Sequence, residues 1–150
     1  MPYRGWQGSA LTRDGNIPRP RPARGQPEPP VIVVLRAADG PQLREVLAGI
    51  EEEGVPYSVQ WPPRINTEAA SATGLARQAA LRSPLHVGVG VGAAGDVCVH
   101  HDKLSEPLSE LCSDGAADRD VARTLGHNAA RIVVSLPLKP MPRTPILSFG

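Results

Sequence analysis

Residues 31–35, with the sequence VIVVL, form an uninterrupted apolar run, and this run constrains the fold more than any other feature of the chain. A strand that faces water on one side alternates apolar and polar residues, whereas a strand buried on both faces is apolar throughout. Strands of the second kind belong to parallel sheets that carry helices on both faces. We therefore expect an α/β domain that begins near residue 31.

A helix is predicted directly after this strand, over residues 40–54. Its apolar residues recur at the spacing i, i+3, i+4 and i+7, which places them on one face: Leu43, Val46, Leu47 and Ile50. Asp39 is expected to cap the N-terminus, with Pro41 in the first turn. Gly54 is expected to end the helix.

The remaining elements alternate in type along the chain. We expect a strand over 57–61, a helix from Asn66 or Thr67 to Arg82, a hairpin of strands over 85–92 and 97–101, a short strand over 108–112, and a helix over 121–134. This order predicts an α/β three-layer sandwich with a mostly parallel sheet of about five strands, including one antiparallel strand. Its crossover connections should be right-handed.

The strand predicted over 85–92 carries glycine at every second position, at Gly88, Gly90 and Gly92. Glycines on one face of a strand indicate that another part of the structure approaches that face closely. They do not form a phosphate-binding loop, because a dinucleotide fingerprint needs G-x-G-x-x-G at a turn from strand to helix. Nucleotide binding by these glycines is therefore not expected.

The two ends of the chain differ from its middle. Residues 1–30 hold seven prolines and five arginines against two acidic residues, so this arm carries a net charge of +3 within a chain of net charge +1. Such a segment buries too little apolar surface to offset its chain entropy, and we expect a disordered arm. Residues 139–150 contain three further prolines and are expected to be irregular.

Three adjacent glutamates, residues 51–53, stand at the C-terminal end of the predicted 40–54 helix. We call them the acidic triplet. Their charges repel one another, and a helix C-terminus already disfavours negative charge. At about 100° per residue the three side chains fan out, so at most one lies near the apolar face. Two interpretations remain open: a solvated helix end, or a site for a metal ion or a basic surface.

The other polar residues do not form a catalytic arrangement. His100, His101 and Asp102 are adjacent, so on a strand they face alternate sides and cannot together bind one ion in regular geometry. The chain has neither the CxxC nor the HxxxH spacing of zinc sites. Cys98 and Cys112 are not expected to form a disulfide framework, which fits a reducing cytosol. We therefore expect a subunit without catalytic activity.

Composition excludes two further classes of function. A net charge of +1 and five aromatic residues give no reason to expect nucleic-acid binding. No apolar run approaches the length of a membrane span, and the N-terminus has no secretory signal.

Three segments resemble known sequence patterns in order and spacing. Residues 44–57, REVLAGIEEEGVPY, are similar to REVLxGIEEEGIP. Residues 79–88, AALRSPLHVG, resemble AARSSPLLVGI, and residues 126–137 resemble TGNNAARLVKGIPF. These patterns are typical of the subunits associated with B12-dependent dehydratases, in particular the small subunits of the diol and glycerol dehydratase reactivating factors. The resemblance covers about residues 31–138, which we expect to form one domain.

The resemblance implies the fold of the dehydratase medium subunit. It also implies a hetero-oligomer in which this non-catalytic chain pairs with a large, chaperone-like ATPase subunit. Such a complex is expected in the cytoplasm, where it can be associated with a bacterial microcompartment. The complex would release damaged cobalamin from diol or glycerol dehydratase by subunit exchange, so the dehydratase subunits are the second group of partners.

Site residues follow from the same resemblance. Glu52, in the middle of the triplet, is expected to reach Mg²⁺ or Ca²⁺ at the interface with the large subunit, because hard cations take carboxylate oxygens. No metal is expected to bind this chain alone. The partner interface is expected to include Glu51, Glu53, His100, Lys103 and Asn128. An asparagine inside a helix is unfavourable unless its amide is used, either to cap a neighbouring loop or to contact a partner.

Two departures and two alternatives remain. The chain has His127 where the family has the first of two asparagines, and the 1–30 arm is not part of the family pattern. The first alternative is a medium subunit of the B12-dependent dehydratase itself. The second is a scaffold domain of a microcompartment, which would use the arm as a tether.

Overall fold

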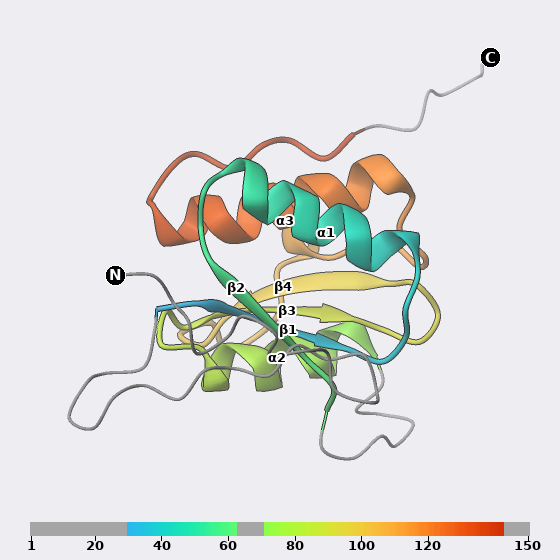
Figure 1. Ribbon diagram of the computed structural model, residues 1–150, viewed down its shortest axis with the longest axis horizontal. Coiled ribbons are helices and arrows are strands. Elements are labelled where there is room, and N and C mark those ends of the chain that lie inside the picture. The colour runs from blue at the N-terminus through green and yellow to red at the C-terminus, as the bar shows by residue number, and fades with distance from the viewer. Residues whose placement is uncertain (1–29, 63–70, 143–150) are drawn as a thin grey trace, which may run out of the picture.

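The computed structural model of the chain describes residues 30–62 and 71–142 (Figure 1). Its elements are β1 (Ile32–Arg36), α1 (Pro41–Glu52), β2 (Tyr57–Gln60), α2 (Ala72–Arg82), β3 (Val87–Val91), β4 (Val97–His101), a 3-10 turn η2 (Ser109–Leu111) and α3 (Arg119–Val133). The strand order is β2-β1-β3-β4; β1 pairs in parallel with β2 and β3, and β3 pairs antiparallel with β4. The predicted α/β class with one antiparallel strand is confirmed, but the sheet of the described residues has four strands and not five.

The described residues form three layers, with α1 and α3 on one face of the sheet and α2 on the other (Figure 1). β1 lies in the middle and is buried along its whole length. Ile32 and Val34 join the core under α1 and α3, whereas Val33 and Leu35 pack with Leu75 of α2. This alternation confirms that the 31–35 run is a strand buried on both faces.

The glycines of β3 face α2. A Cβ atom on Gly88 would overlap the backbone of Ala79 and Ala80, and one on Gly90 would overlap the carbonyl of Ala72. The helix therefore lies directly on the strand, which is possible because α2 presents small residues there. The expected close approach to these glycines is confirmed, and its source is α2.

The starts of the first two helices differ from the prediction. Gly40 and not Asp39 occupies the N-cap of α1, without a side-chain cap. Asp39 instead pairs with Arg36, whose guanidinium lies 4.3 Å from the ring centroid of Trp61. Ser71 caps α2 by accepting a hydrogen bond from the Gly74 amide at 3.2 Å. The predicted caps Asn66 and Thr67 lie outside the described residues, as do residues 1–29 of the arm and 143–150 of the tail.

The strand predicted over 108–112 is wrong. The 3-10 turn η2 occupies most of this segment, and a single antiparallel bridge follows, between Cys112 and Cys98 of β4. The turn forms because Leu111 enters the core under α1 and α3, where it is 2% exposed. The sequence prediction was also wrong about the cysteines, because Cys98 and Cys112 are joined by a disulfide. Across the described residues, none of the helices is long and apolar enough to cross a membrane.

Candidate functional site

Helices α1 and α3 pack with their backbones in contact. A Cβ atom on Gly49 would overlap the Arg123 carbonyl, and one on Gly126 would overlap the Val46 carbonyl. Side chains at the end of α1 therefore reach across to α3 without a gap. This contact positions the acidic triplet.

Three basic residues recur every four positions along α3, so Arg123, His127 and Arg131 share one face of the helix. Glu53 lies against this face. Its Oε2 atom is 2.7 Å from Nδ1 of His127 and 2.9 Å from Nε of Arg131, and its side chain is 12% exposed. The last glutamate of the triplet is thus held by two bases of the same chain.

Glu52 contacts the same face of α3 but remains more open to solvent. Its Oε1 atom lies 2.8 Å from Nε2 of His127 and 3.2 Å from Nε of Arg123, while its side chain is 45% exposed. Arg123 also donates to Glu45 Oε1 at 3.1 Å. Both ring nitrogens of His127 therefore face carboxylates of the acidic triplet.

The electrostatic environment favours the ionised form of these two glutamates. The hydrogen bond from Arg123 is the main cause that holds the pKa of Glu52 below its usual value. Burial alone would raise the pKa of Glu53, but hydrogen bonds from Arg131 and His127 outweigh burial and lower it. The network is accordingly an ionic one, with fixed carboxylates at the end of α1.

Glu51 points away from α3, toward β2. Its Oε1 accepts a hydrogen bond from the Tyr57 hydroxyl at 3.2 Å. Burial of Tyr57, followed by the charge of Glu51, raises the pKa of that phenol. A basic surface was one of the interpretations open for the acidic triplet. Such a surface is present, and it is formed by α3 of the same chain.

Asn128 uses both ends of its side-chain amide on the backbone of Lys139. Its Nδ2 donates to the Lys139 carbonyl at 2.9 Å, and its Oδ1 accepts from the Lys139 amide at 2.7 Å. Arg131 also donates from Nη1 to the Pro137 carbonyl at 3.0 Å. These hydrogen bonds mean that Asn128, which is 1% exposed, caps a neighbouring loop, the segment after α3. That segment presents apolar side chains to solvent: Val134, Leu136 and Leu138.

The residues predicted on the hairpin differ in how deeply they are buried. Lys103 is exposed, and its amide donates to Nδ1 of His101 at 3.1 Å. Asp102 accepts a hydrogen bond from Nδ1 of His86 at 2.6 Å. His100 is 3% exposed, and its Nδ1 has no hydrogen-bond partner within the described part of the chain. Burial is the main cause that lowers the pKa of His100.

The triplet and the hairpin residues nevertheless share one end of the domain. Because β1, β2 and β3 are parallel, α1 ends where β2 and β3 begin. The antiparallel strand β4 ends at the same place, and Lys103 follows it. The sequence therefore brings its predicted interface residues to one end of the sheet, although His100 and Asn128 are buried there.

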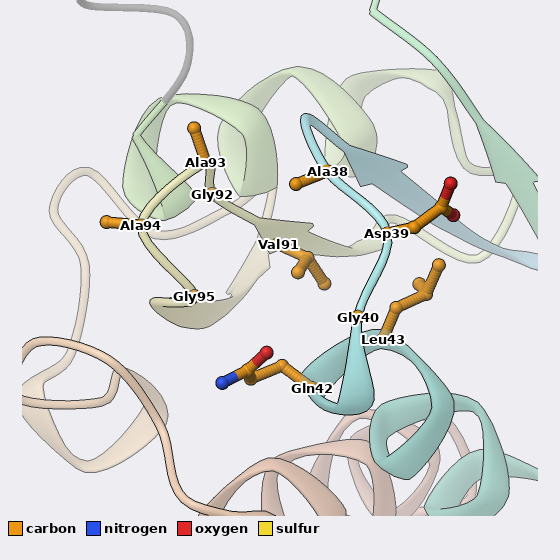
Figure 2. Close-up of a pocket in the computed structure, with 10 residues that line it drawn as sticks. All are labelled: Ala38, Asp39, Gly40, Gln42, Leu43, Val91, Gly92, Ala93, Ala94 and Gly95. Carbon is orange, nitrogen blue, oxygen red and sulfur yellow. The ribbon is translucent and has the colours of Figure 1, made fainter.

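A pocket of about 190 Å³ lies at the opposite end of the sheet, between the loops that follow β1 and β3 (Figure 2). The carboxyl ends of parallel strands at a reversal of strand order are a frequent ligand site. Here the polar side chains are engaged elsewhere, because Asp39 pairs with Arg36 and Gln42 donates to the Ala117 carbonyl at 3.1 Å. Within residues 30–62 and 71–142, three or more histidine, cysteine or acidic side chains are nowhere grouped to hold a metal ion.

Comparison with known families defines the class of protein. The family described as the dehydratase medium subunit matches residues 28–139, and the chain belongs to this family. Within it the chain is a relative of the dehydratase-reactivating small subunits. It is 40% identical to the diol dehydratase-reactivating factor small subunit of Klebsiella michiganensis over 110 residues, which are 72% of this chain and 81% of the relative. It is 36% identical to the propanediol dehydratase-reactivating factor small subunit of Citrobacter freundii, over 73% of this chain and 90% of that one.

Solved structures agree with these relatives. A diol dehydratase-reactivating factor complexed with ADP and Mg²⁺ contains a chain with a TM-score of 0.61 and 36% identity, and the match covers 75% of this chain and 99% of that one. A chain of a glycerol dehydratase reactivase has a TM-score of 0.60 and 30% identity, with 74% and 97% covered. The resemblance found in the sequence is confirmed, and the reactivating small subunit is favoured over a dehydratase medium subunit.

Sequence reasoning missed the basic face of α3. Arg123 and Arg131 were not predicted as site residues, and His127 was treated as a departure from the family pattern. Their spacing of four residues was a usable signal, because residues i, i+4 and i+8 line one side of a helix. What the sequence does not show is that α3 lies against α1, and this depends on Gly49 and Gly126.

Proposed function

We propose that this chain is the non-catalytic small subunit of a dehydratase-reactivating factor. It pairs with a large ATPase subunit in a hetero-oligomer that releases damaged cobalamin from diol or glycerol dehydratase by subunit exchange. The observation that carries this proposal is the match to the solved diol dehydratase-reactivating factor, which covers 99% of the matched chain at 36% identity. The complex acts in the cytoplasm, and inside a microcompartment where the dehydratase is enclosed in one.

The surface for the large subunit lies at the end of the sheet that carries the acidic triplet. Glu51 and Glu52 have exposed carboxylates there, and Lys103 extends the surface on the side of β4. The remaining interface residues act from beneath. Asn128 fixes the segment after α3 through Lys139, and the buried His100 supports the strand that precedes Lys103.

Glu52 is the proposed ligand of Mg²⁺ or Ca²⁺ between the two subunits. Its carboxylate fits such an ion in chemistry, because it is ionised and its side chain is 45% exposed. Both carboxylates are held by two bases of α3, and exposure separates them, because the side chain of Glu53 is 12% exposed against 45% for Glu52. One carboxylate from this chain leaves most of the coordination sphere to the partner, so the proposed ion binds only where the two subunits meet.

Co-purification of the chain with its large subunit, with and without EDTA, tests the proposal. The Glu52→Ala variant should bind the large subunit more weakly and lose the dependence on divalent cations. Glu106→Ala is the matched control, since Glu106 is an exposed glutamate in the loop after β4. Recovery of dehydratase catalytic subunits with bound cobalamin, and of no large subunit, would make the chain an enzyme subunit instead. Equal affinities of wild type and Glu52→Ala would remove Glu52 from the interface.

A further inference from the structure

Cys98 and Cys112 lie directly opposite each other across an antiparallel bridge. Their Cα atoms are 4.1 Å apart, and the neighbouring pair Val97 and Ser113 carries the hydrogen bonds, from the Ser113 amide to the Val97 carbonyl at 2.8 Å and from the Val97 amide to Ser113 Oγ at 3.0 Å. Residues that face each other between such hydrogen-bonded pairs have their side chains closest together. With the segment in place, the backbone therefore holds the two sulfurs side by side, in position to bond.

The disulfide fastens a segment that is otherwise held at a few points. Residues 108–113, which we call the η2 segment, cross the edge of the sheet at β4. Leu111 enters the core on the side of α1 and α3, whereas Cys112 packs with Cys98 and Ala76 on the side of α2. The segment leads through Ala117, whose amide donates to the Gly95 carbonyl at 2.9 Å, into the N-terminus of α3. Release of the segment thus affects the edge of the sheet and the start of α3.

The two sulfurs differ in their access to solvent. Cys98 is 1% exposed, while Cys112 is partly exposed. Thiol–disulfide exchange requires an attacking thiolate that reaches the sulfur, so access favours Cys112 as the point of entry. The described residues hold no other cysteine, since the chain has two in all.

We propose that Cys98 and Cys112 form a reversible redox pair that fastens and releases the η2 segment. Oxidation uses a low-molecular-weight disulfide such as oxidised glutathione. The Cys112 thiolate attacks one of its sulfurs, which forms a mixed disulfide and releases one small thiolate. The Cys98 thiolate then attacks the Cys112 sulfur and releases the second. Two electrons pass from the protein to the small disulfide, and the two protons of the protein thiols go to the two small thiols formed. Reduction is the reverse reaction.

Equilibration of the full chain in buffers of varied reduced and oxidised glutathione, followed by acid quench, alkylation and intact mass measurement, tests the chemistry. We expect one transition between a form with two alkylated thiols and a form with none, both monomeric in the chain. Two alkylated thiols in the most oxidising buffer, a persistent glutathione adduct, or no alkylation in the most reducing buffer would each overturn the reversible pair. Cys98→Ser, which leaves the more accessible Cys112, should remain a single thiol that takes up glutathione.

Hydrogen exchange and thermal unfolding of the two forms test the structural effect. Because the disulfide closes a loop of about 15 residues, the oxidised chain should unfold about 10 °C higher than the reduced chain. Amides of residues 104–117 should lose more protection after reduction than those of β1. Cys112→Ser should show the same melting temperature in both buffers. A uniform rise in exchange over the whole domain, or equal melting temperatures of the two wild-type forms, would contradict a local release.

Discussion

His127 donates from Nδ1 to Oε2 of Glu53 at 2.7 Å and so joins the middle of α3 to the C-terminal end of α1. A triplet of like charges at a helix C-terminus is unfavourable by itself. In this chain the cost is offset by bases that are 74 and 78 residues away in sequence from Glu53. The acidic triplet is therefore part of the tertiary structure as well as a surface feature.

His127→Ala should destabilise the domain. The substitution removes the contacts of both ring nitrogens with carboxylates from a side chain that is 11% exposed, and it leaves Glu53 with one base in place of two. We expect the free energy of unfolding to fall by about 2 kcal/mol, measured by urea denaturation at neutral pH. Arg44→Ala, at an exposed position of α1, is the control and should change stability by less than about 0.5 kcal/mol. Equal midpoints for the two variants would show that the histidine contacts contribute nothing.

The stabilising effect of Glu53 should depend on pH in a defined direction. Its pKa is lower in the folded chain than the value of 4.5 for an unperturbed glutamate, so the ionised form favours folding. The contribution is complete above the unfolded pKa and is lost as pH falls through the folded pKa. Wild type should therefore exceed Glu53→Gln in stability at about pH 7, and the difference should shrink below about pH 4.5.

Urea denaturation of both proteins across this pH range measures the effect. Glu106→Gln is the control, because Glu106 is an exposed glutamate in the loop after β4. A gap between wild type and Glu53→Gln that stays constant down to about pH 3 would mean that ionisation of Glu53 is not the cause.

Gly126→Ala should destabilise the contact between α1 and α3. The new methyl group would overlap the carbonyl of Val46, which is backbone and cannot rotate away. We expect a loss of about 2–3 kcal/mol, visible as a lower midpoint of urea denaturation. Gly74→Ala, in the first turn of α2, is the matched control and should leave stability unchanged or raise it through helix propensity. If both variants were equally stable, α3 would have room to move away from α1.

How much the sequence could predict depends on the range of the interaction. The burial of β1 on both faces and the apolar face of α1 follow from local apolar patterns, and both were predicted. Asp39 failed as a cap because Arg36, three residues earlier, binds its carboxylate. The disulfide and the ionic network could not be predicted from spacing. Cys98 meets Cys112 only because η2 turns the chain back to β4, and α3 reaches the triplet only through two glycines.

Asn128→Ala should release the segment that follows α3. The side-chain amide of Asn128 is the hydrogen-bond partner of the Lys139 backbone amide and carbonyl, and both of these hydrogen bonds are lost in the variant. We expect the amides of residues 136–142 to exchange with solvent faster by about tenfold, which corresponds to about 1.4 kcal/mol of local stability, in a hydrogen-exchange experiment read by mass spectrometry. The amides of β1 and β3 should keep their protection, because the segment lies outside the sheet. Arg119→Ala, at the exposed first position of α3, serves as the control.

If the Asn128→Ala variant binds the large subunit as tightly as wild type although the segment is released, the exposed apolar residues Val134, Leu136 and Leu138 do not contribute to docking. Weaker binding together with faster exchange would place that segment in the subunit interface.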